Sequence, residues 1–240
     1  MKKYLSEAEQ MEIEEIVRAS NEVDQTDYTA PDDADLWFLS RHLGKIVSFL
    51  AVFFMGDTHD GCPVDEIMLF TLPSERGKKR AGKLYEKYAV YASQGSGEIP
   101  HVRFSAYHAV STERFLRKTG AFHEGDELLM VRKLSGGGDL PEEDRSFRNA
   151  HSECSVKTYG DTAYIYGVRT DASHLRQGSA EALLSEVLAE ISEEGAGTAL
   201  LQVASLNTPA VRLYEKLSFT VAERIELWYD TGLRDFLQER

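Results

Sequence analysis

The sequence contains an internal repeat, and this repeat limits the folds that are open to the chain. Residues 76–84 can be laid over residues 175–183, 99 positions later, and Phe122 over Phe219, 97 positions later. The second copy is incomplete because it lacks the leading helices of the first copy. We therefore expect two related halves that pack on each other as one α/β protein.

Hydrophobic periodicity predicts strands followed by helices in both copies. In the first copy, we expect helices at 6–23, after Pro73 and at 112–118, and strands at 36–40, 45–55, 64–72 and 101–109. In the second copy, we expect strands at 153–159, 162–168, 199–204 and 221–229, and helices at 178–191 and 209–217. Ser6 is the expected N-cap of the first helix, and Gly120 is expected to end the third.

A Gly-rich stretch separates the two copies. Residues 135–144 read SGGGDLPEED, a composition typical of an exposed loop or a linker. We therefore predict an N-terminal lobe at 1–134, a linker at 135–144 and a C-terminal lobe at 145–240.

The charge balance excludes some classes of partner. The 240 residues carry a formal net charge of −13, and the only dense basic run is residues 76–80. A nucleic-acid-binding surface needs more concentrated positive charge than this. No segment approaches membrane-spanning length, and the N-terminus turns acidic before the apolar run of a signal peptide. We therefore expect neither a nucleic-acid partner nor a membrane.

Cysteine and histidine usage favours a cytoplasmic protein without a metal. Cys62 and Cys154 are too few for the disulfide framework of a secreted protein, so a reducing cytoplasm is expected. The two cysteines do not have the spacing of a metal knuckle. The seven histidines include no His-x-x-x-His pair and no neighbouring cysteine, so we predict no metal site.

The segment 162–183 is predicted to form a strand, a tight loop and the start of a helix. Gly178 and Ala180 are small, so the backbone at the helix start can approach a ligand closely. Backbone N–H groups at a helix start hold phosphate groups without many positive side chains. This loop is therefore the best pyrophosphate candidate in an acidic chain; the simpler alternative is that Gly178 only ends a loop.

The loop and the residues after it resemble the GNAT superfamily of acetyl-CoA-dependent N-acetyltransferases. In that family the pattern Arg/Gln-x-x-Gly-x-Gly/Ala follows the fourth strand and cradles the CoA pyrophosphate, and here the six residues are LRQGSA at 175–180. Leu175 stands where a basic or amide residue is expected, and Arg176 beside it can supply the charge. The resemblance implies acetyl-CoA as co-substrate, with contacts from Val168, Arg169, Thr170, Leu175, Arg176, Gln177, Gly178, Ser179, Ala180, Glu181, Asn207 and Tyr214.

The resemblance continues through residues 199–219. The family has a strand, an Asn, a short helix bearing a Tyr, and a Gly-Phe stop, and Asn207, Tyr214 and Phe219 match it in this order. Ser218 replaces the Gly, which weakens the helix stop but touches no chemistry. Asn207 is also explained as a helix N-cap, a role compatible with ligand binding. Tyr214 lies on an apolar stripe that would equally suit a core residue.

The resemblance implies N-acetyl transfer to a primary amine by direct attack on the thioester. The attack builds an oxyanion, which a strand N–H near Val168 would stabilise, and Tyr214 would give a proton to the departing thiolate. Tyr164 and Tyr166 share a strand face and would line the acceptor site, although ordinary strand packing explains them as well. The acidic balance favours a cationic acceptor, either a small molecule or a peptide, and no quaternary state follows from the sequence.

The general base is not evident from the sequence. An amine must lose a proton before it attacks, and a carboxylate or an ordered water normally accepts that proton. Asp161 and Glu153 are the nearest acids in the second copy and Glu66 is their counterpart in the first, but none is distinguished from a surface acid. The missing base supports an alternative function, a non-catalytic acyl-CoA-binding or sensor protein.

The first copy resembles the same family more distantly. It keeps the opening Arg76 and Gly77, but Lys79 stands where the close-approach Gly belongs. No Asn follows at the expected place, and Leu116 takes the Tyr position. We therefore expect tandem GNAT lobes with mixed, mostly antiparallel sheets flanked by helices, in which a degenerate N-terminal lobe walls the acceptor site. The other possibility is an active site in the first lobe, built on Arg76 and Lys78.

Overall fold

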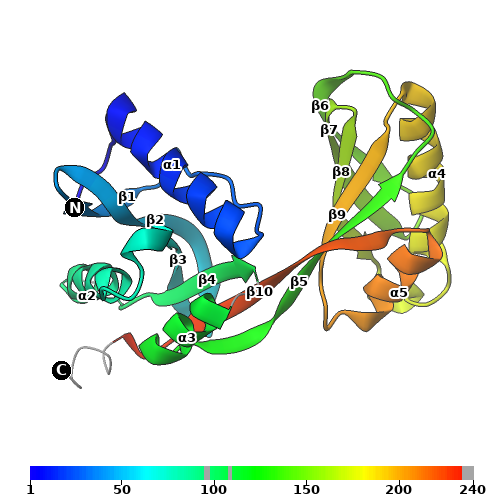
Figure 1. The fold of residues 1–240 in the computed structure, drawn as a ribbon. Helices are drawn as coiled ribbons and strands as arrows, with labels where there is room; N and C mark the ends of the chain where they lie inside the picture. Colours follow the sequence, from blue (N-terminus) through cyan, green and yellow to red (C-terminus); the bar gives the residue numbers. More distant parts are fainter. Residues whose placement is uncertain (95–97, 108–109, 234–240) are drawn as a thin grey trace. The chain divides into compact units, whose positions relative to one another are not determined.

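The computed structural model describes residues 1–94, 98–107 and 110–233 (Figure 1). The chain forms two compact units: unit 1 contains Met1–Glu124 and Glu226–Arg240, and unit 2 contains Gly125–Ile225. In each unit, helices pack on strands that are mixed but mostly antiparallel, so the predicted fold class is confirmed. Within the described residues, no helix is both long enough and apolar enough to cross a membrane.

Unit 1 begins with α1 (Glu7–Asp24) and three antiparallel strands, β1 (Leu36–His42), β2 (Lys45–His59) and β3 (Cys62–Thr71). After them come α2 (Arg80–Ser93), β4 (His101–Tyr107), which pairs parallel with β3, and α3 (Val110–Thr119). Residues 108 and 109, the end of one predicted strand, lie outside the described residues.

Alternate side chains of these strands face different helices. Trp37 and Phe49 pack with Ile13 and Ile16 of α1 in one buried cluster. Phe38 and Leu50, their neighbours in sequence, pack with residues of α2 and α3 in another, including Leu84, Tyr85, Tyr88 and Leu116. Because successive strand residues point to opposite faces, α1 covers one face of the sheet and α2 with α3 the other.

Ser6 caps α1 as the sequence predicts. Its side chain accepts the Glu9 N–H, and the Glu9 carboxylate accepts the Ser6 N–H in return. Glu9 also pairs with Lys2 and Arg41, each at 2.6 Å. The hydrogen bond from Lys2, followed by that from the Ser6 backbone, lowers the pKa of Glu9 to about 2. One carboxylate therefore links the N-terminus, α1 and β1.

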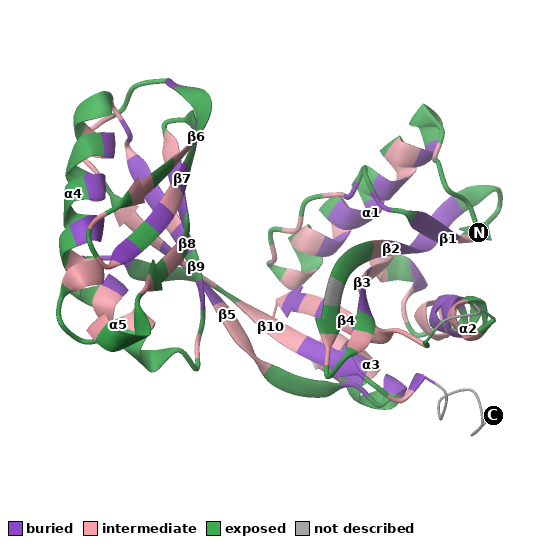
Figure 2. Ribbon diagram, turned by 180° about the vertical axis from the view of Figure 1, so that it is seen from behind, coloured by how far each residue is buried: buried purple, intermediate pink, exposed green. Residues whose placement is uncertain are grey.

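Unit 2 repeats this order of elements. β6 (Leu140–Arg148), β7 (Ser152–Gly160) and β8 (Thr162–Thr170) pair antiparallel, and β9 (Thr198–Ala204) pairs parallel with β8. The helices are α4 (Ser179–Glu194) and α5 (Thr208–Lys216). Five apolar residues form the buried stripe of α4 visible in Figure 2: Leu183, Leu184, Val187, Leu188 and Ile191. They share the unit 2 core with Val156, Ile165 and Leu201 of the strands.

The last strand of each copy lies among the strands of the other copy. β5 (Phe122–Lys133) follows the first copy in sequence, yet Glu127–Lys133 pairs antiparallel with β9. β10 (Thr220–Asp230) follows the second copy but is the neighbour of β4, and Glu226–Asp230 belongs to unit 1. The buried Tyr85 of α2 donates to the buried Asp230 at 2.6 Å, which anchors the end of β10 in unit 1.

This packing differs from the predicted boundaries of 1–134, 135–144 and 145–240. β6 begins at Leu140, so the second half of the predicted linker is a strand. Because β6 is an edge strand that exposes most of its side chains, its acidic, Pro-containing sequence shows no alternating pattern. β5 is also absent from the predicted elements, since its first three residues are exposed and mostly polar.

The two loops that align in the sequence have the same backbone shape. A short 3₁₀ turn, Pro73–Glu75 or Ala172–His174, precedes each loop. The paired positions are Arg76 and Leu175, both extended (φ −66° and −61°), Gly77 and Arg176, both left-handed (76° and 61°), and Lys79 and Gly178, both left-handed (59° and 83°). The aligned loops therefore differ in side chains and not in backbone conformation.

Candidate functional site

The start of α4 presents backbone N–H groups that no side chain caps. Its N-cap, Gly178, is left-handed, and a Cβ built there would meet nothing within 4 Å. The N–H groups of Ser179, Ala180 and Glu181 lie in the first turn, where a helix supplies no acceptor of its own. The start of α4 therefore offers the uncapped, positive end of a helix dipole to an anion.

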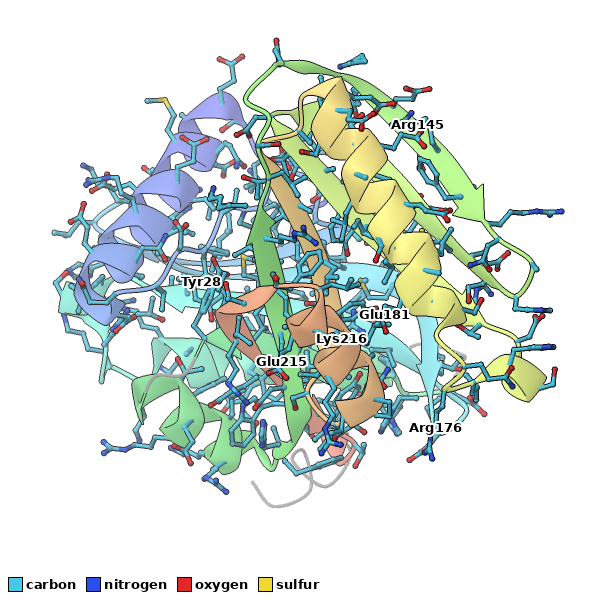
Figure 3. All side chains as sticks on the ribbon, turned by 90° about the vertical axis from the view of Figure 1, so that its right-hand side faces the viewer. Tyr28, Arg145, Arg176, Glu181, Glu215 and Lys216 are labelled. Atoms are coloured by element: carbon cyan, nitrogen blue, oxygen red, sulfur yellow. The ribbon has the colours of Figure 1, made fainter. Side chains whose placement is uncertain are left out.

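The side chains of the preceding loop leave this helix start open. Leu175, Arg176 and Gln177 are all exposed, and the Gln177 amide donates to the Ser173 carbonyl at 3.1 Å. Arg176 has no ion-pair partner among the described residues, and Figure 3 shows it ahead of the helix that carries Glu181. An unpaired guanidinium thus stands beside Gly178, next to the position that Leu175 fills.

Ser179 is held in place by a network that the sequence does not indicate. Its hydroxyl donates to Asn149 Oδ1 at 3.0 Å and accepts from Ser152 at 2.9 Å, and the Asn149 amide donates to the Ser179 carbonyl at 2.9 Å. The Ser152 hydroxyl also lies 2.9 Å from that of Thr170. Asn149 lies in the turn between β6 and β7 and Ser152 begins β7, so this turn and the start of β7 fix the direction of the first N–H groups of α4.

An ion pair links the first turn of α4 to the end of α5. Lys216 Nζ lies 2.6 Å from the Glu181 carboxylate, and Figure 3 shows the two residues on neighbouring helices. Both side chains are solvent-accessible, so the pair adds little to stability. Its electrostatic effect is local, because Lys216 neutralises Glu181, which would otherwise repel an anion from the helix start.

β8 loses its regular pairing on both sides as it approaches the loop. Its parallel pairing with β9 ends at Tyr164 and Leu200. On the other side the register with β7 shifts, so that Gly167 and Val168 together face Cys154. Gly167 has φ +62°, a conformation that suits such a bulge. A bulge leaves backbone groups outside the ladder, and in β8 this happens next to Val168.

Asn207 and Tyr214 lie on α5 in the expected order. The Ala210 N–H donates to Asn207 Oδ1 at 3.3 Å, which confirms the N-cap role. Tyr214 is buried in the unit 2 core, and its ring centroid lies 6.1 Å from that of Phe219. Burial, with a smaller contribution from Cys154, raises the pKa of Tyr214. Tyr214 is therefore a core residue whose hydroxyl stays protonated.

Tyr164 and Tyr166 form an aromatic wall on the sheet face opposite α4. Their rings stack with centroids 5.8 Å apart and planes 12° apart. The Tyr164 hydroxyl donates to Gln202 of β9 at 3.0 Å, and the Tyr166 hydroxyl donates to Asp144 of β6 at 2.8 Å. Burial, followed by the charge of Glu127, raises the pKa of Tyr164. Both rings are thus fixed by hydrogen bonds, and acids lie at the edge of the wall.

The acids considered as general base are occupied or remote. Glu153 lies 3.2 Å from the Arg169 guanidinium, and Glu66 lies 2.6 Å from that of Arg103. Asp161 is in the turn before β8, at the opposite end of the strand from the loop, where its carbonyl accepts two backbone N–H groups. Two of the three acids are therefore paired with arginines, and the third lies at the far end of β8 from the loop.

The stretch that carries these residues matches a known protein family. Residues 146–219 match the model of the Acetyltransferase (GNAT) family. The matched stretch runs from β6 to Phe219, just before β10, and includes the loop, Asn207 and Tyr214. We refer to residues 146–219, the stretch that this family model matches, as the GNAT domain.

A curated relative matches part of the chain. It is the [ribosomal protein bS18]-alanine N-acetyltransferase of Escherichia coli strain K12, 34% identical over 71 residues, which are 30% of this chain and 48% of the relative. The chain thus spans about half the length of the curated relatives it matches.

Two solved structures resemble nearly the whole chain. A GCN5-related N-acetyltransferase from Sphaerobacter thermophilus is 15% identical, with 95% of this chain and 94% of the other covered and a TM-score of 0.71. A tandem GNAT protein from the clavulanic acid biosynthesis pathway is 12% identical, with 94% and 95% covered and a TM-score of 0.60. At these identities, the likeness shows that the fold is shared.

In unit 1, the loop that aligns with that of the GNAT domain is occupied by its own side chains. Arg76 makes two hydrogen bonds to Asp24, at 2.6 and 2.8 Å. Lys78 and Arg80 both bond to the buried Glu75, and these bonds, that of Lys78 first, lower the pKa of Glu75. The cations of the alternative active site are therefore already paired with acids of the same unit.

Unit 1 also differs from the GNAT domain at the strands ahead of its loop. The ring of Tyr28 (labelled in Figure 3) packs edge-on against Phe70 of β3 and Tyr107 of β4, with centroids 5.0 and 4.6 Å away. The Tyr107 N–H donates to the Tyr28 hydroxyl at 2.6 Å. β3 keeps its register with β2 through Leu69, the position that aligns with Val168. Tyr28 thus fills the space between β3 and β4, and β3 has no bulge there.

Two histidines and an aspartate meet beside the loop of the GNAT domain, although the sequence predicts no metal site. The ligand atoms of His151, Asp171 and His174 lie within 4.8 Å of one another. The two imidazole rings stack, with their centroids 3.5 Å apart and an angle of 5° between their planes. A metal lies near the plane of each ring that binds it, and two parallel planes this far apart cannot share one ion. In this conformation the three residues therefore do not form a ligand set.

Proposed function

We propose that the GNAT domain is an N-acetyltransferase that moves the acetyl group of acetyl-CoA to a primary amine. The observation that carries the proposal is the uncapped start of α4, which follows a strand that loses its pairing on both sides. The family match supports acetyl-CoA as the donor because it covers this loop together with Asn207 and Tyr214.

The CoA pyrophosphate is assigned to the N–H groups of Ser179, Ala180 and Glu181. Hydrogen bonds from N–H groups to a charged phosphate are stronger than those to neutral acceptors, and the helix dipole adds to them. Gly178 leaves room for the phosphate, and the unpaired Arg176 supplies a positive side chain. The pantetheine arm then follows β8 back along Thr170, Arg169 and Val168, while Gln177 and Asn207 flank the donor.

The acceptor amine attacks the thioester carbonyl carbon directly. As the C–N bond forms, the carbonyl oxygen becomes an oxyanion, and a backbone N–H at the Gly167–Val168 bulge donates to it. When the C–S bond breaks, Tyr214 gives its proton to the CoA thiolate, and its raised pKa supports this role because the acid is present in full at neutral pH. The proton of the amine leaves through ordered water, since Glu153 and Glu66 are both paired with arginines.

The acceptor is assigned to the wall formed by Tyr164 and Tyr166. Aromatic faces attract ammonium groups, and Asp144 adds a negative charge at the edge. The name of the Escherichia coli relative specifies an alanine of a ribosomal protein as its acceptor. A peptide amine is therefore the first class to test, and polyamines and aminoglycosides are the small-molecule alternatives.

Unit 1 is assigned as a degenerate GNAT lobe in a tandem protein. The repeated strand order and the matching loop conformations support this, as does the fold shared with a tandem GNAT protein. On this assignment, the sequence before residues 135–144 and the sequence after them each encode one lobe. The two lobes have exchanged their last strands, β5 and β10. Cys62 and Cys154 are both free thiols, which supports a reducing, cytoplasmic setting.

An acyl-CoA sensor without turnover is the second candidate, favoured by the pairing of Glu153 and Glu66 with arginines. Thiol release from acetyl-CoA, measured with an alanine-initiated peptide, a lysine peptide, spermidine and an aminoglycoside, separates the two. The transferase predicts release with at least one amine and a product that is one acetyl group heavier. Calorimetric binding of acetyl-CoA without release for every amine would favour the sensor, and no binding would contradict both functions.

A further inference from the structure

Unit 1 contains a cavity of about 620 Å³ beside the start of α2. Residues of β3, β4, α2 and α3 line it. Its apolar lining includes Ile67, Leu69, Phe104, Phe115 and Leu116. The volume lies within the range of small-molecule sites, roughly 300–1,000 Å³, so the cavity can hold a ligand of some size.

The charge of this cavity is opposite to that of the whole protein. Its lining has five basic side chains, Arg76, Lys79, Arg80, Lys83 and Lys118, and three acidic ones, Asp24, Glu75 and Glu86. The two arginines bond to Asp24 and Glu75. The three lysines have no ion-pair partner in the part of the chain that the structure describes. In a chain with a net charge of −13, three unpaired lysines around one apolar cavity favour an anionic ligand.

The same cavity is unsuited to CoA. Lys79 has a side chain where the GNAT domain has Gly178, and the ionised Glu75 lies just ahead of the helix start. Tyr28 occupies the space between β3 and β4, so a thioester arm has no path between the strands. The ligand must therefore be smaller than CoA and must fit between the apolar lining and the lysines.

We infer that the unit 1 cavity binds an amphipathic anion, with an apolar body against Leu69, Phe104 and Phe115 and a carboxylate or phosphate head at Lys79, Lys83 and Lys118. This combination places the apolar surface out of water and pairs the head group with lysines that have no ion-pair partner among residues 1–94, 98–107 and 110–233. The site is separate from the donor site assigned to α4, so its occupation does not depend on acetyl transfer.

Gly82 allows the inference to be tested without damage to the fold. It lines the cavity within α2, and a Cβ built there meets nothing within 4 Å. The Gly82→Leu variant fills the cavity while improving helix propensity, and Gly82→Ala is its small matched control. The Lys83→Gln/Lys118→Gln double variant removes two head-group charges, and Lys87→Gln is its control because Lys87 is exposed on α2 outside the lining.

The full-length protein is titrated by calorimetry with decanoate, decyl phosphate and the neutral decanol. At least one anion should bind saturably, and decanol should bind at least about tenfold more weakly. Gly82→Leu and the double lysine variant should each weaken the anion by about tenfold or more, and both controls by less than about twofold. A preference between the two anions identifies the head group as carboxylate or phosphate.

Three results would overturn the inference. The first is no saturable binding of either anion, and the second is unchanged binding in Gly82→Leu. The third is loss of CoA binding in Gly82→Leu, which would make the cavity a CoA site. Acetyl-CoA binding by the start of α4 is measured separately, so failure of this inference leaves the proposed transferase function intact.

Discussion

Gly178→Ala gives a sharp test of the proposed donor site because unit 2 contains a matched control. Gly178 and Gly160 are both left-handed, at φ +83° and +55°, and a Cβ meets nothing within 4 Å at either. Gly178 precedes α4, whereas Gly160 ends β7 just before β8 begins, and the nine residues of β8, about 30 Å long, separate that turn from the loop. Alanine should therefore strain both positions alike but disturb the pyrophosphate site at only one.

The expected magnitudes follow from these positions. A left-handed alanine costs about 1–2 kcal/mol, and the reduced freedom of the unfolded chain offsets about 0.4–1 kcal/mol of this. Each variant should thus lose about 1 kcal/mol of unfolding free energy, or about 2–4 °C in Tm. At Gly178 the new methyl group also displaces the phosphate from N–H donors. Loss of one hydrogen bond to a charged group costs about 1.5–3 kcal/mol, which corresponds to about 10–150-fold in Kd.

The assay is isothermal calorimetry with acetyl-CoA on the wild type and both variants, combined with thermal unfolding. We expect similar losses of Tm in the two variants, weaker binding in Gly178→Ala and unchanged binding in Gly160→Ala. Unchanged affinity for acetyl-CoA in both variants would refute the argument that the start of α4 holds the pyrophosphate. Equal weakening in both would show that strain, and not the phosphate contact, controls binding.

Three further predictions concern catalysis, backbone strain and acid stability. Tyr214→Phe should lower kcat by about 10²–10⁴-fold with the acetyl-CoA Kd nearly unchanged, whereas a purely structural tyrosine would leave kcat intact in a steady-state assay. Lys79→Gly should raise the unfolding free energy by about 0.5–1 kcal/mol in urea titration, because glycine relieves a left-handed lysine; destabilisation would mean that the lysine side chain contributes more than the strain costs. Glu9→Gln tests acid stability: the folded pKa of Glu9 is lowered to about 2, so its contribution is present above the unfolded value of 4.5 and is lost as the pH falls toward 2. Between pH 5 and pH 2.5 (about the span of these pKa values), the wild type should therefore lose about 1–2 kcal/mol more than the variant, and parallel pH profiles would contradict this.

The sequence predicts the regular elements well where hydrophobic periodicity is strong. The helix at 6–23 and the strands at 45–55 and 162–168 correspond to α1, β2 and β8 with ends shifted by a few residues. β5 and β6 escape prediction for a physical reason, because the first residues of β5 and most of β6 are exposed and leave no alternating pattern.

The alignment of the two loops also carries over to the structure. Lys79 adopts the left-handed conformation of Gly178, and Ser218, which replaces the Gly of the family pattern, is also left-handed, at φ 65°. The Phe219 N–H still bonds to the Tyr214 carbonyl at 3.0 Å, so the helix stop survives. A sequence repeat can thus identify a backbone conformation even where the residue type has changed.

The contacts that distinguish the two units cannot be read from the sequence. Tyr28 reaches Tyr107 across 79 positions, and Asn149 reaches Ser179 across 30. Neither pair has a periodic or motif-like signal, because each contact depends on the placement of a loop on a finished sheet. The exchange of β5 and β10 is hidden for the same reason, since strand order depends on packing and not on the pattern within a strand.

The location of the CoA pyrophosphate tests the central claim most directly. A crystal structure of the full-length protein with acetyl-CoA bound would measure the distances from the phosphate oxygens to the backbone nitrogens of both helix starts. We predict hydrogen bonds from Ser179, Ala180 or Glu181, with the thioester beside the bulge at Val168. A pyrophosphate at the start of α2, held by Arg80 or Lys79, would contradict the account.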